Sequence, residues 1–163
     1  MLGKAIQDLT VEFVKRWIPV RSRTNDPMVQ AARSNPQNIA EGYTQESLSI
    51  YINLSGIARG SSEELGKDFE DFLRQRGLPI WPKDDQRIRV FREFRVFWID
   101  QNALNTPKLP NDPTEAANMI LTFCRMEGYL LRRHVESLKK KHEQEGGLRE
   151  NLPKKRLGYR NNH

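Results

Sequence analysis

One run of spacings constrains the fold of this chain more than any other feature. Between residues 46 and 76, apolar and small residues recur at intervals of 3, 4, 3, 4, 3, 4 and 3, namely Leu48, Tyr51, Ser55, Ala58, Ser62, Leu65, Phe69 and Phe72. Residues three and four apart lie on the same face of an α-helix. The pattern stops at Gly77. It therefore predicts a long helix over residues 46–76 whose middle presents small side chains.

Three glycines lie inside this predicted helix, and each costs about 1 kcal/mol relative to alanine. The cost of Gly56, Gly60 and Gly66 is more easily tolerated where another backbone lies close by. The small residues at the middle of the helix would permit such an approach by the preceding helix. We therefore expect the two helices to pack closely, with Ala58 between them.

The preceding helical segment contains a proline in its middle. Asp26 and Pro27 predict its N-cap and first helical position. A face of small and apolar residues stays in phase across Pro36, and it consists of Met28, Ala31, Asn35, Ile39 and Gly42. The pattern indicates a kinked helix, or a helix broken for one turn and recapped by Asn35, that ends near Gly42.

Three further helices are predicted. Residues 2–18 carry a helical stripe that Pro19 stops, formed by Leu2, Ile6, Leu9, Phe13 and Trp17. Asp84 or Asp85 caps a fourth helix that reaches about Leu104, and Asp112-Pro113 begins a fifth that runs to about Glu145, where Gly146-Gly147 ends it. The expected fold is all-α: an antiparallel four-helix bundle with an additional helix over 84–104. Residues 1–145 form the bundle domain, and residues 146–163 form a basic C-terminal extension.

Positive charge is concentrated at the end of the chain. The formal net charge of the 163 residues is +6, and residues 139–163 contribute eight basic residues against three acidic ones. A basic extension without packing periodicity is explained equally by a solvated disordered tail and by contact with phosphates. The cations that we predict to contact nucleic acid are Lys139, Lys140, Lys141, Arg149, Lys154, Lys155, Arg156 and Arg160.

The fourth predicted helix combines basic and aromatic residues. Arg87, Arg89, Arg92 and Arg95 alternate with Phe91, Phe94 and Phe97. Such a pattern can bind single strands through phosphate contacts and base stacking. An amphipathic helix with its aromatic side chains inside the protein explains the same pattern, and we favour that interpretation.

Two stretches of the sequence resemble a known family. QAARSNPQNIAEGY and LSGIARGSSEELGKDFEDFL are similar to the hallmark segments of the bacterial four-helix-bundle proteins first noticed in intervening sequences of 23S ribosomal RNA genes. The chain looks like a variant of this family with a C-terminal suffix, and the helix at 84–104 departs from its short members. The residues that match the motifs are Ala31, Ala32, Ser34, Pro36, Asn38, Ile39, Ala40, Glu41, Gly42, Ala58, Gly60, Ser61, Glu64 and Leu65.

The resemblance implies partners as well as a fold. One related branch, the accessory variability determinant of diversity-generating retroelements, is a basic homopentamer of such bundles that binds a reverse transcriptase and RNA. By this analogy we expect a homo-oligomer, with a pentamer as one option, that binds RNA and a reverse transcriptase or another protein.

Catalytic chemistry finds no support in the sequence. No glutamate stands three residues before any of the three histidines, so the Glu-x-x-His motif of di-metal bundles is missing. No phosphate-binding glycine loop follows a strand, and no arrangement of His or Asn points to Cys124 as a nucleophile. We therefore expect no enzyme, no catalytic residues, no cofactor and no metal.

Cellular location is predicted from apolar runs and cysteine usage. The N-terminus lacks the apolar run of a signal peptide, and no run of about 18 apolar residues that could span a membrane occurs. The lone Cys124 within an apolar-periodic segment fits a reducing compartment. These features predict a cytoplasmic protein without a membrane partner.

Two functions from different classes remain. The first is a non-catalytic, oligomeric accessory protein that binds nucleic acid and prefers RNA. The second is a scaffold that binds only protein, through its helix faces and its own oligomerisation.

Overall fold

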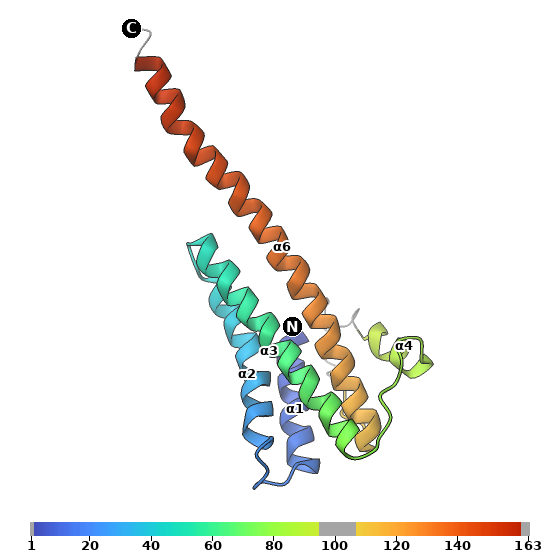
Figure 1. Ribbon diagram of the computed structural model, residues 1–163. Coiled ribbons are helices and arrows are strands. Elements are labelled where there is room, and N and C mark those ends of the chain that lie inside the picture. The colour runs from blue at the N-terminus through green and yellow to red at the C-terminus, as the bar shows by residue number, and fades with distance from the viewer. Residues whose placement is uncertain (1, 95–106, 161–163) are drawn as a thin grey trace.

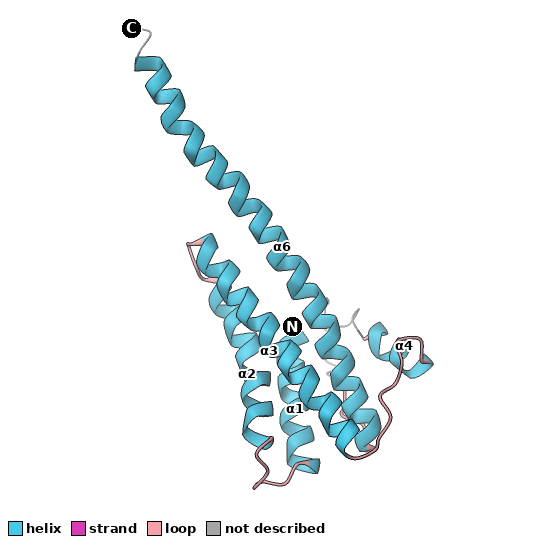
Figure 2. Ribbon diagram, in the orientation of Figure 1, coloured by secondary structure: helices cyan, strands magenta, loops and turns pink. Residues whose placement is uncertain are grey.

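The computed structural model describes residues 2–94 and 107–160, with side chains described up to residue 145. Its elements are α-helices and no strand occurs in these ranges (Figure 2): α1 Leu2–Trp17, α2 Asn25–Tyr43, α3 Leu48–Gln75, α4 Gln86–Glu93 and α6 Pro113–Arg160. The prediction of an all-α fold is confirmed for the described residues.

Most of the helices pack side by side. Contacts join α1 to α2, α2 to α3, α3 to α6 and α6 back to α1, while α4 lies against α6. Short connections make α1, α2 and α3 run alternately down and up (Figure 1). The central position belongs to α3 and α6, which share the most extensive contact.

The core changes character along the helices. At the end where α1 finishes and α6 begins, the interior is aromatic: the ring of Phe13 lies 4.9 Å from Phe69 and 4.8 Å from Phe72 between centroids, with edge-on geometry. Toward the N-terminus of α3, the buried residues are small or polar, and they include Ser55, Ala58, Ser61 and Ser62. Apolar burial therefore stabilises one end of the helical body, whereas close helix approach characterises the other.

Several predicted helix boundaries are confirmed. Asp85 caps α4 by accepting a 2.9 Å hydrogen bond from the backbone N–H of Arg87. Asp112 likewise accepts from the backbone N–H of Glu115 at 2.9 Å, directly before α6 begins. After α3 ends, Gly77 has a φ of 64°, a left-handed conformation in which glycine carries no steric penalty.

The predicted start of α2 is wrong. The helix begins at Asn25, one residue before the predicted cap Asp26, and the residue at the N-cap position is Thr24. Thr24 makes no capping bond with its side chain; its hydroxyl lies 2.6 Å from that of Ser22. The Asp-Pro pair therefore lies within the first turn, where a proline needs no N–H partner and a carboxylate suits the helix dipole.

The helix α2 continues through Pro36 as a single element. The alternative in which Asn35 recaps a broken helix is wrong, because the Asn35 side chain points to another helix: its Nδ2 donates a 2.9 Å hydrogen bond to the carbonyl oxygen of Ala58 on α3. Both Asn35 and Pro36 are buried. The polar residue before the proline thus joins α2 to α3.

The last helix is longer than predicted. Gly146-Gly147 does not end it, since α6 has 48 residues and continues to Arg160. At 1.5 Å per residue, such a helix is about 72 Å long. Glycine lowers helix propensity, but it ends a helix only where its backbone adopts the left-handed conformation. Because helix propagation is cooperative, an existing helix can continue through two glycines. The final part of α6 extends alone beyond the α2–α3 connection (Figure 1).

The fourth helix is shorter than predicted in the described range. α4 ends at Glu93, with Phe94 as its C-cap. The rest of the predicted helix, residues 95–104, lies outside the described residues.

The glycines of α3 follow two patterns. A Cβ at Gly66 would lie 3.6 Å from the Cβ of Cys124 on α6, so a neighbouring helix does lie close there. At Gly56 and Gly60, an added Cβ would meet no atom within 4 Å. The expectation of a nearby backbone is therefore wrong within this chain for these two residues, which face outward.

Candidate nucleic-acid interface

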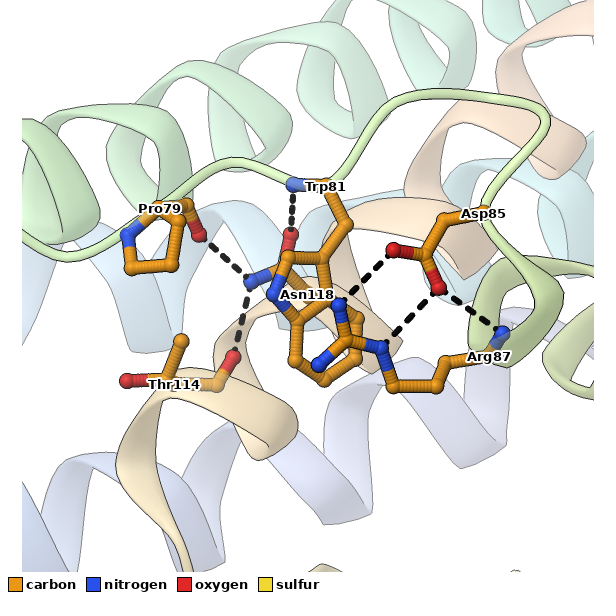
Figure 3. A network of polar contacts seen from close by, with 6 residues as sticks. All are labelled: Pro79, Trp81, Asp85, Arg87, Thr114 and Asn118. Atoms are coloured by element: carbon orange, nitrogen blue, oxygen red, sulfur yellow. Dashed lines mark hydrogen bonds and ion pairs between the residues drawn. The ribbon is translucent and has the colours of Figure 1, made fainter.

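A side chain of α6 holds the connection between α3 and α4 in place. The Asn118 carbonyl oxygen accepts a 2.8 Å hydrogen bond from the backbone N–H of Trp81, and its amide nitrogen donates at 2.9 Å to the carbonyl oxygens of Pro79 and Thr114 (Figure 3). Asn118 is itself only 1% exposed. Because each polar atom of this buried amide is paired, the connection is fixed against α6 rather than loosely attached.

An aromatic and charged contact orients α4 next to this connection. The guanidinium of Arg87 lies 3.5 Å from the ring centroid of Trp81 and also pairs with Asp85 at 2.7 Å (Figure 3). Hydrogen bonds from Arg87 lower the pKa of the Asp85 carboxyl to about 2. The indole in turn stacks on Phe91 at 6.2 Å between centroids. These contacts turn one face of α4 toward α6 and leave the other exposed.

The space between α4 and α6 is a cavity of about 390 Å³ with a basic lining. We call it the basic groove. Its residues come from the α3–α4 connection, α4 and α6, and they are Lys83, Ile88, Arg92, Thr122, Arg125, Met126 and Tyr129. Three cations from three separate segments therefore converge on one cavity, whereas none of the described residues that line it is acidic.

The three cations of the basic groove differ in their availability. Arg125 pairs with Glu70 of α3, with 2.8 Å between guanidinium nitrogen and carboxylate oxygen. Lys83 and Arg92 are exposed and have no ion-pair partner in the described part of the chain. These two side chains are the ones most available to an incoming anion.

An exposed aromatic ring stands at the edge of the basic groove. Tyr129 is 48% exposed, and the guanidinium carbons of Arg132 and Arg133 lie 5.6 Å and 5.9 Å from its ring centroid. Sequence reasoning missed Tyr129, although a tyrosine three and four residues before two arginines on a helix places all three on one face. It also missed Lys83 and Arg125, which only the packing of α4 on α6 brings together.

The predicted nucleic-acid-binding cations lie farther along α6. Lys139, Lys140 and Lys141 are exposed. The remaining predicted residues belong to the helix rather than to an irregular tail, while their side chains lie outside the described ones: Arg149, Lys154, Lys155, Arg156 and Arg160. The residues of α6 that line the basic groove and these cations therefore lie at successive positions of the same helix.

The aromatic residues of α4 do not line an exposed surface. Ile88 and Phe91 are buried, whereas Arg87, Arg89 and Arg92 are exposed. The amphipathic interpretation is confirmed for this part of the helix, so a base cannot stack on Phe91. Arg95 and Phe97 lie outside the described residues.

The motif residues shared with the resembled family lie mainly where α2 meets α3. The hydroxyl of Ser61 donates to that of Ser34 at 3.0 Å, and Asn38 Nδ2 donates to the Ser34 carbonyl oxygen at 2.8 Å. A Cβ at Gly42 would lie 2.6 Å from the ring of Tyr51, so only glycine fits there. Ala58 is buried and its carbonyl oxygen accepts the bond from Asn35. The other buried or half-buried motif residues are Ala31, Ala32, Pro36, Ile39 and Leu65, while Ala40, Glu41, Gly60 and Glu64 are exposed.

Searches of the described residues for other kinds of site gave negative results. No group of three or more His, Cys, Asp or Glu residues in these ranges could hold a metal ion. None of the described helices combines the length and the apolar character needed to cross a membrane. Cys124 is buried, and burial raises the pKa of its thiol well above the usual range, so the reactive thiolate is disfavoured.

Comparison with known proteins returned no relative. The chain matches no protein-family model, no curated protein and no solved structure.

Proposed function

We propose that the protein is a non-catalytic accessory protein that binds single-stranded RNA along α6. The observation that carries the proposal is the basic groove: Lys83 and Arg92 are exposed beside Tyr129, whose ring is half exposed. Cations next to an accessible aromatic ring suit a strand, since phosphates need positive charge and any base can stack on a ring or on a guanidinium.

The end of α6 extends the same chemistry. From Lys139 to Arg160 the helix rises about 32 Å, which corresponds to several nucleotides of an extended strand. Lysines near the C-terminal end of a helix also complement the helix dipole. The three lysines 139–141 are not at such an end, because α6 continues to Arg160, so the dipole does not explain their presence. A strand that starts in the basic groove can thus follow α6.

Filter binding of single-stranded RNA across a salt series tests this proposal. If about six cations neutralise phosphates, the logarithm of the affinity falls with the logarithm of salt concentration at a slope of about −4, and removal of residues 147–163 roughly halves that slope. The melting temperature serves as the folding control, because the deletion itself removes the helical residues 147–160 of α6. RNA binding that is undetectable at low salt would reject the proposal in favour of a scaffold that binds only protein.

We further propose that the chain belongs to the resembled family, that α1, α2, α3 and α6 form its four-helix bundle, and that the chain acts as a cytoplasmic homo-oligomer. The closed series of contacts among these helices supports the bundle.

On the outward face of α3, Ile50 and Ile57 are 48% and 45% exposed beside the open Gly56 and Gly60, which favours contact with a second copy. Light scattering should give a mass several times 19.1 kDa; a strict monomer would contradict this part.

The protein-binding alternative remains distinguishable by affinity purification. A partner such as a reverse transcriptase that is retained after nuclease treatment binds the protein directly. Partners that are all released by nuclease are held through RNA, as the main proposal expects.

A further inference from the structure

A carboxyl group is buried in the polar part of the helical body without a cation to neutralise it. Glu127 of α6 is 4% exposed, and its Oε2 accepts a 3.1 Å hydrogen bond from the hydroxyl of Ser62 on α3. No ion pair to Glu127 occurs in the part of the chain that the structure describes. Burial raises the pKa of this carboxyl to about 7. An unpaired buried charge is costly, so this residue needs either a proton or a positively charged partner.

A second acceptor without a donor lies next to the first. Asn35 is 3% exposed; its Nδ2 donates to the carbonyl oxygen of Ala58, whereas its Oδ1 has no hydrogen-bond partner among the described residues. A Cβ added to Gly3 of α1 would lie 2.7 Å from both Asn35 Oδ1 and Glu127 Oε1. The two oxygens therefore converge on the same point of α1 and are supplied with no donor by the described residues.

A cavity of about 250 Å³ opens beside Glu127 and has apolar and aromatic walls. We call it the Glu127 pocket. Its other lining residues are Leu2, Ile39, Tyr43, Tyr51, Ser55, Leu130, Leu131 and His134. The rings of Tyr51 and His134 lie 5.2 Å apart between centroids, and those of Tyr43 and Tyr51 lie 5.5 Å apart. The walls therefore suit a small ligand with a flat, apolar body.

Among the described residues, the other titratable groups near Glu127 bring no charge that would neutralise it. Burial lowers the pKa of His134, whose Nε2 lies 2.7 Å from the hydroxyl oxygen of Tyr51, so the imidazole is neutral at pH 7. Burial and the neighbouring Tyr43 raise the pKa of Tyr51 to about 12. Cys124, also on α6, has a raised pKa and is neutral as well. On α1, the lining residue Leu2 and the adjoining Gly3 carry no titratable side chain.

We propose that the Glu127 pocket binds a small organic cation, a primary amine attached to a flat apolar body. The ammonium would donate to Glu127, whose carboxyl group lines the pocket, and the body would lie among Tyr43, Tyr51 and Leu131. An ammonium carries three N–H donors and a charge opposite to that of the carboxylate. An anion would be repelled by Glu127, and a neutral ligand would leave the carboxylate unpaired.

Proton release accompanies this binding and provides a signature. Only the ionised form of Glu127 attracts the cation, so the apparent affinity follows the ionised fraction. For a pKa of about 7, that fraction rises about 30-fold between about pH 5.5 and about pH 8. Protonation of His134 at low pH acts in the same direction, because a second positive charge would repel the amine.

Isothermal titration of the full chain with phenethylamine tests the proposal, with the neutral 2-phenylethanol as the matched ligand. We expect phenethylamine to bind one site and to gain about 30-fold in affinity from about pH 5.5 to about pH 8, while the alcohol gains nothing. Glu127→Gln should remove the preference for the amine over the alcohol. Any pH dependence of the affinity that remains in this variant is due to His134. Glu136→Gln, an exposed change on the same helix, should behave like the original protein.

Two results would overturn the proposal. One is the absence of phenethylamine binding at about pH 8 and about 10 mM ligand, a concentration that detects even weak affinities. The other is equal binding of the amine and the alcohol in both the original protein and Glu127→Gln. The test does not depend on RNA binding, because the basic groove and the Glu127 pocket share no lining residue.

Discussion

The basic groove and the Glu127 pocket lie along the same helix and differ in what they leave without a partner. The basic groove leaves cations, since Lys83 and Arg92 are exposed and unpaired in the described region. The Glu127 pocket has an unpaired acceptor, since Glu127 is buried and no described cation pairs with it. In water, an unpaired charge costs little, whereas inside the protein it must be protonated or bound. Under the two proposals, the same helix borders an anion site at the surface and a cation site inside.

This difference also explains how each cavity is built. Asn118 and Trp81 fix the α3–α4 connection so that Lys83 faces α6, and all polar atoms of the Asn118 amide are satisfied. Asn35 has a similar role between α2 and α3, but only its nitrogen is satisfied. The buried amide of Asn118 therefore has all its hydrogen bonds. Among the described residues, the buried amide of Asn35 keeps a free carbonyl oxygen that a protonated carboxyl group or a ligand could donate to.

The largest effect that could break this contrast is charge reversal in the basic groove. Lys83→Glu combined with Arg92→Glu should weaken single-stranded RNA binding about 100-fold at low salt and should reduce the magnitude of the salt slope by about 1.4, because each lost phosphate contact on a single strand removes about 0.7. Filter binding measures both quantities. Lys4→Glu with Lys15→Glu makes the same charge change on the exposed face of α1 and should cost far less. Equal losses in both pairs would indicate a general charge effect without a groove.

A second test concerns how stability depends on pH around Glu127. Its pKa is about 7 in the folded protein, above the ordinary value of 4.5, so the folded state binds the proton more tightly. The stabilisation is complete below about pH 4.5 and is lost as pH rises through about 7, by about 3 kcal/mol at most. Urea unfolding across this range should show the decline in the original protein and a flatter profile in Glu127→Gln. Parallel profiles would mean that Glu127 is solvated.

A smaller effect tests the close packing that shapes the Glu127 pocket. Ala58 is 0% exposed and its carbonyl oxygen receives the Asn35 bond. Ala58→Leu should overpack the contact between α2 and α3 and destabilise the fold by about 1 to 3 kcal/mol. Ala40→Leu, the same change at an exposed position of α2, is the control and should change the melting temperature little. An unchanged melting temperature in Ala58→Leu would contradict the close approach of the two helices.

The sequence predicted the helices well because their signals are local. The seam of α3 is buried from Ser55 to Phe72, and the caps Asp85 and Asp112 form as expected. The end of α6 was predicted wrongly. Gly146-Gly147 only lowers the local helix propensity, and a long helix can continue through such a pair. For the same reason the predicted irregular extension is helical up to Arg160.

The two cavities were much harder to predict because they depend on contacts between distant segments. Lys83, Arg92 and Arg125 come together only when α4 packs on α6, and their spacing in the sequence carries no periodic signal. Glu127 looks in the sequence like one more charged residue of a helix. Its burial against Gly3 and Ser62 depends on the relative rotation of α1, α3 and α6, which a hydrophobic pattern does not determine.

Photocrosslinking tests most directly the central claim that RNA lies in the basic groove and along α6. Single-stranded RNA containing 4-thiouridine is bound to the full chain at low salt, irradiated and digested, and the crosslinked peptides are identified by mass spectrometry. The account predicts crosslinks on the peptides that contain Tyr129 and Lys83, with more on the segment from Lys139 to Arg160. Crosslinks confined to α1, α2 or the outer face of α3, or none at all from a folded protein, would contradict it.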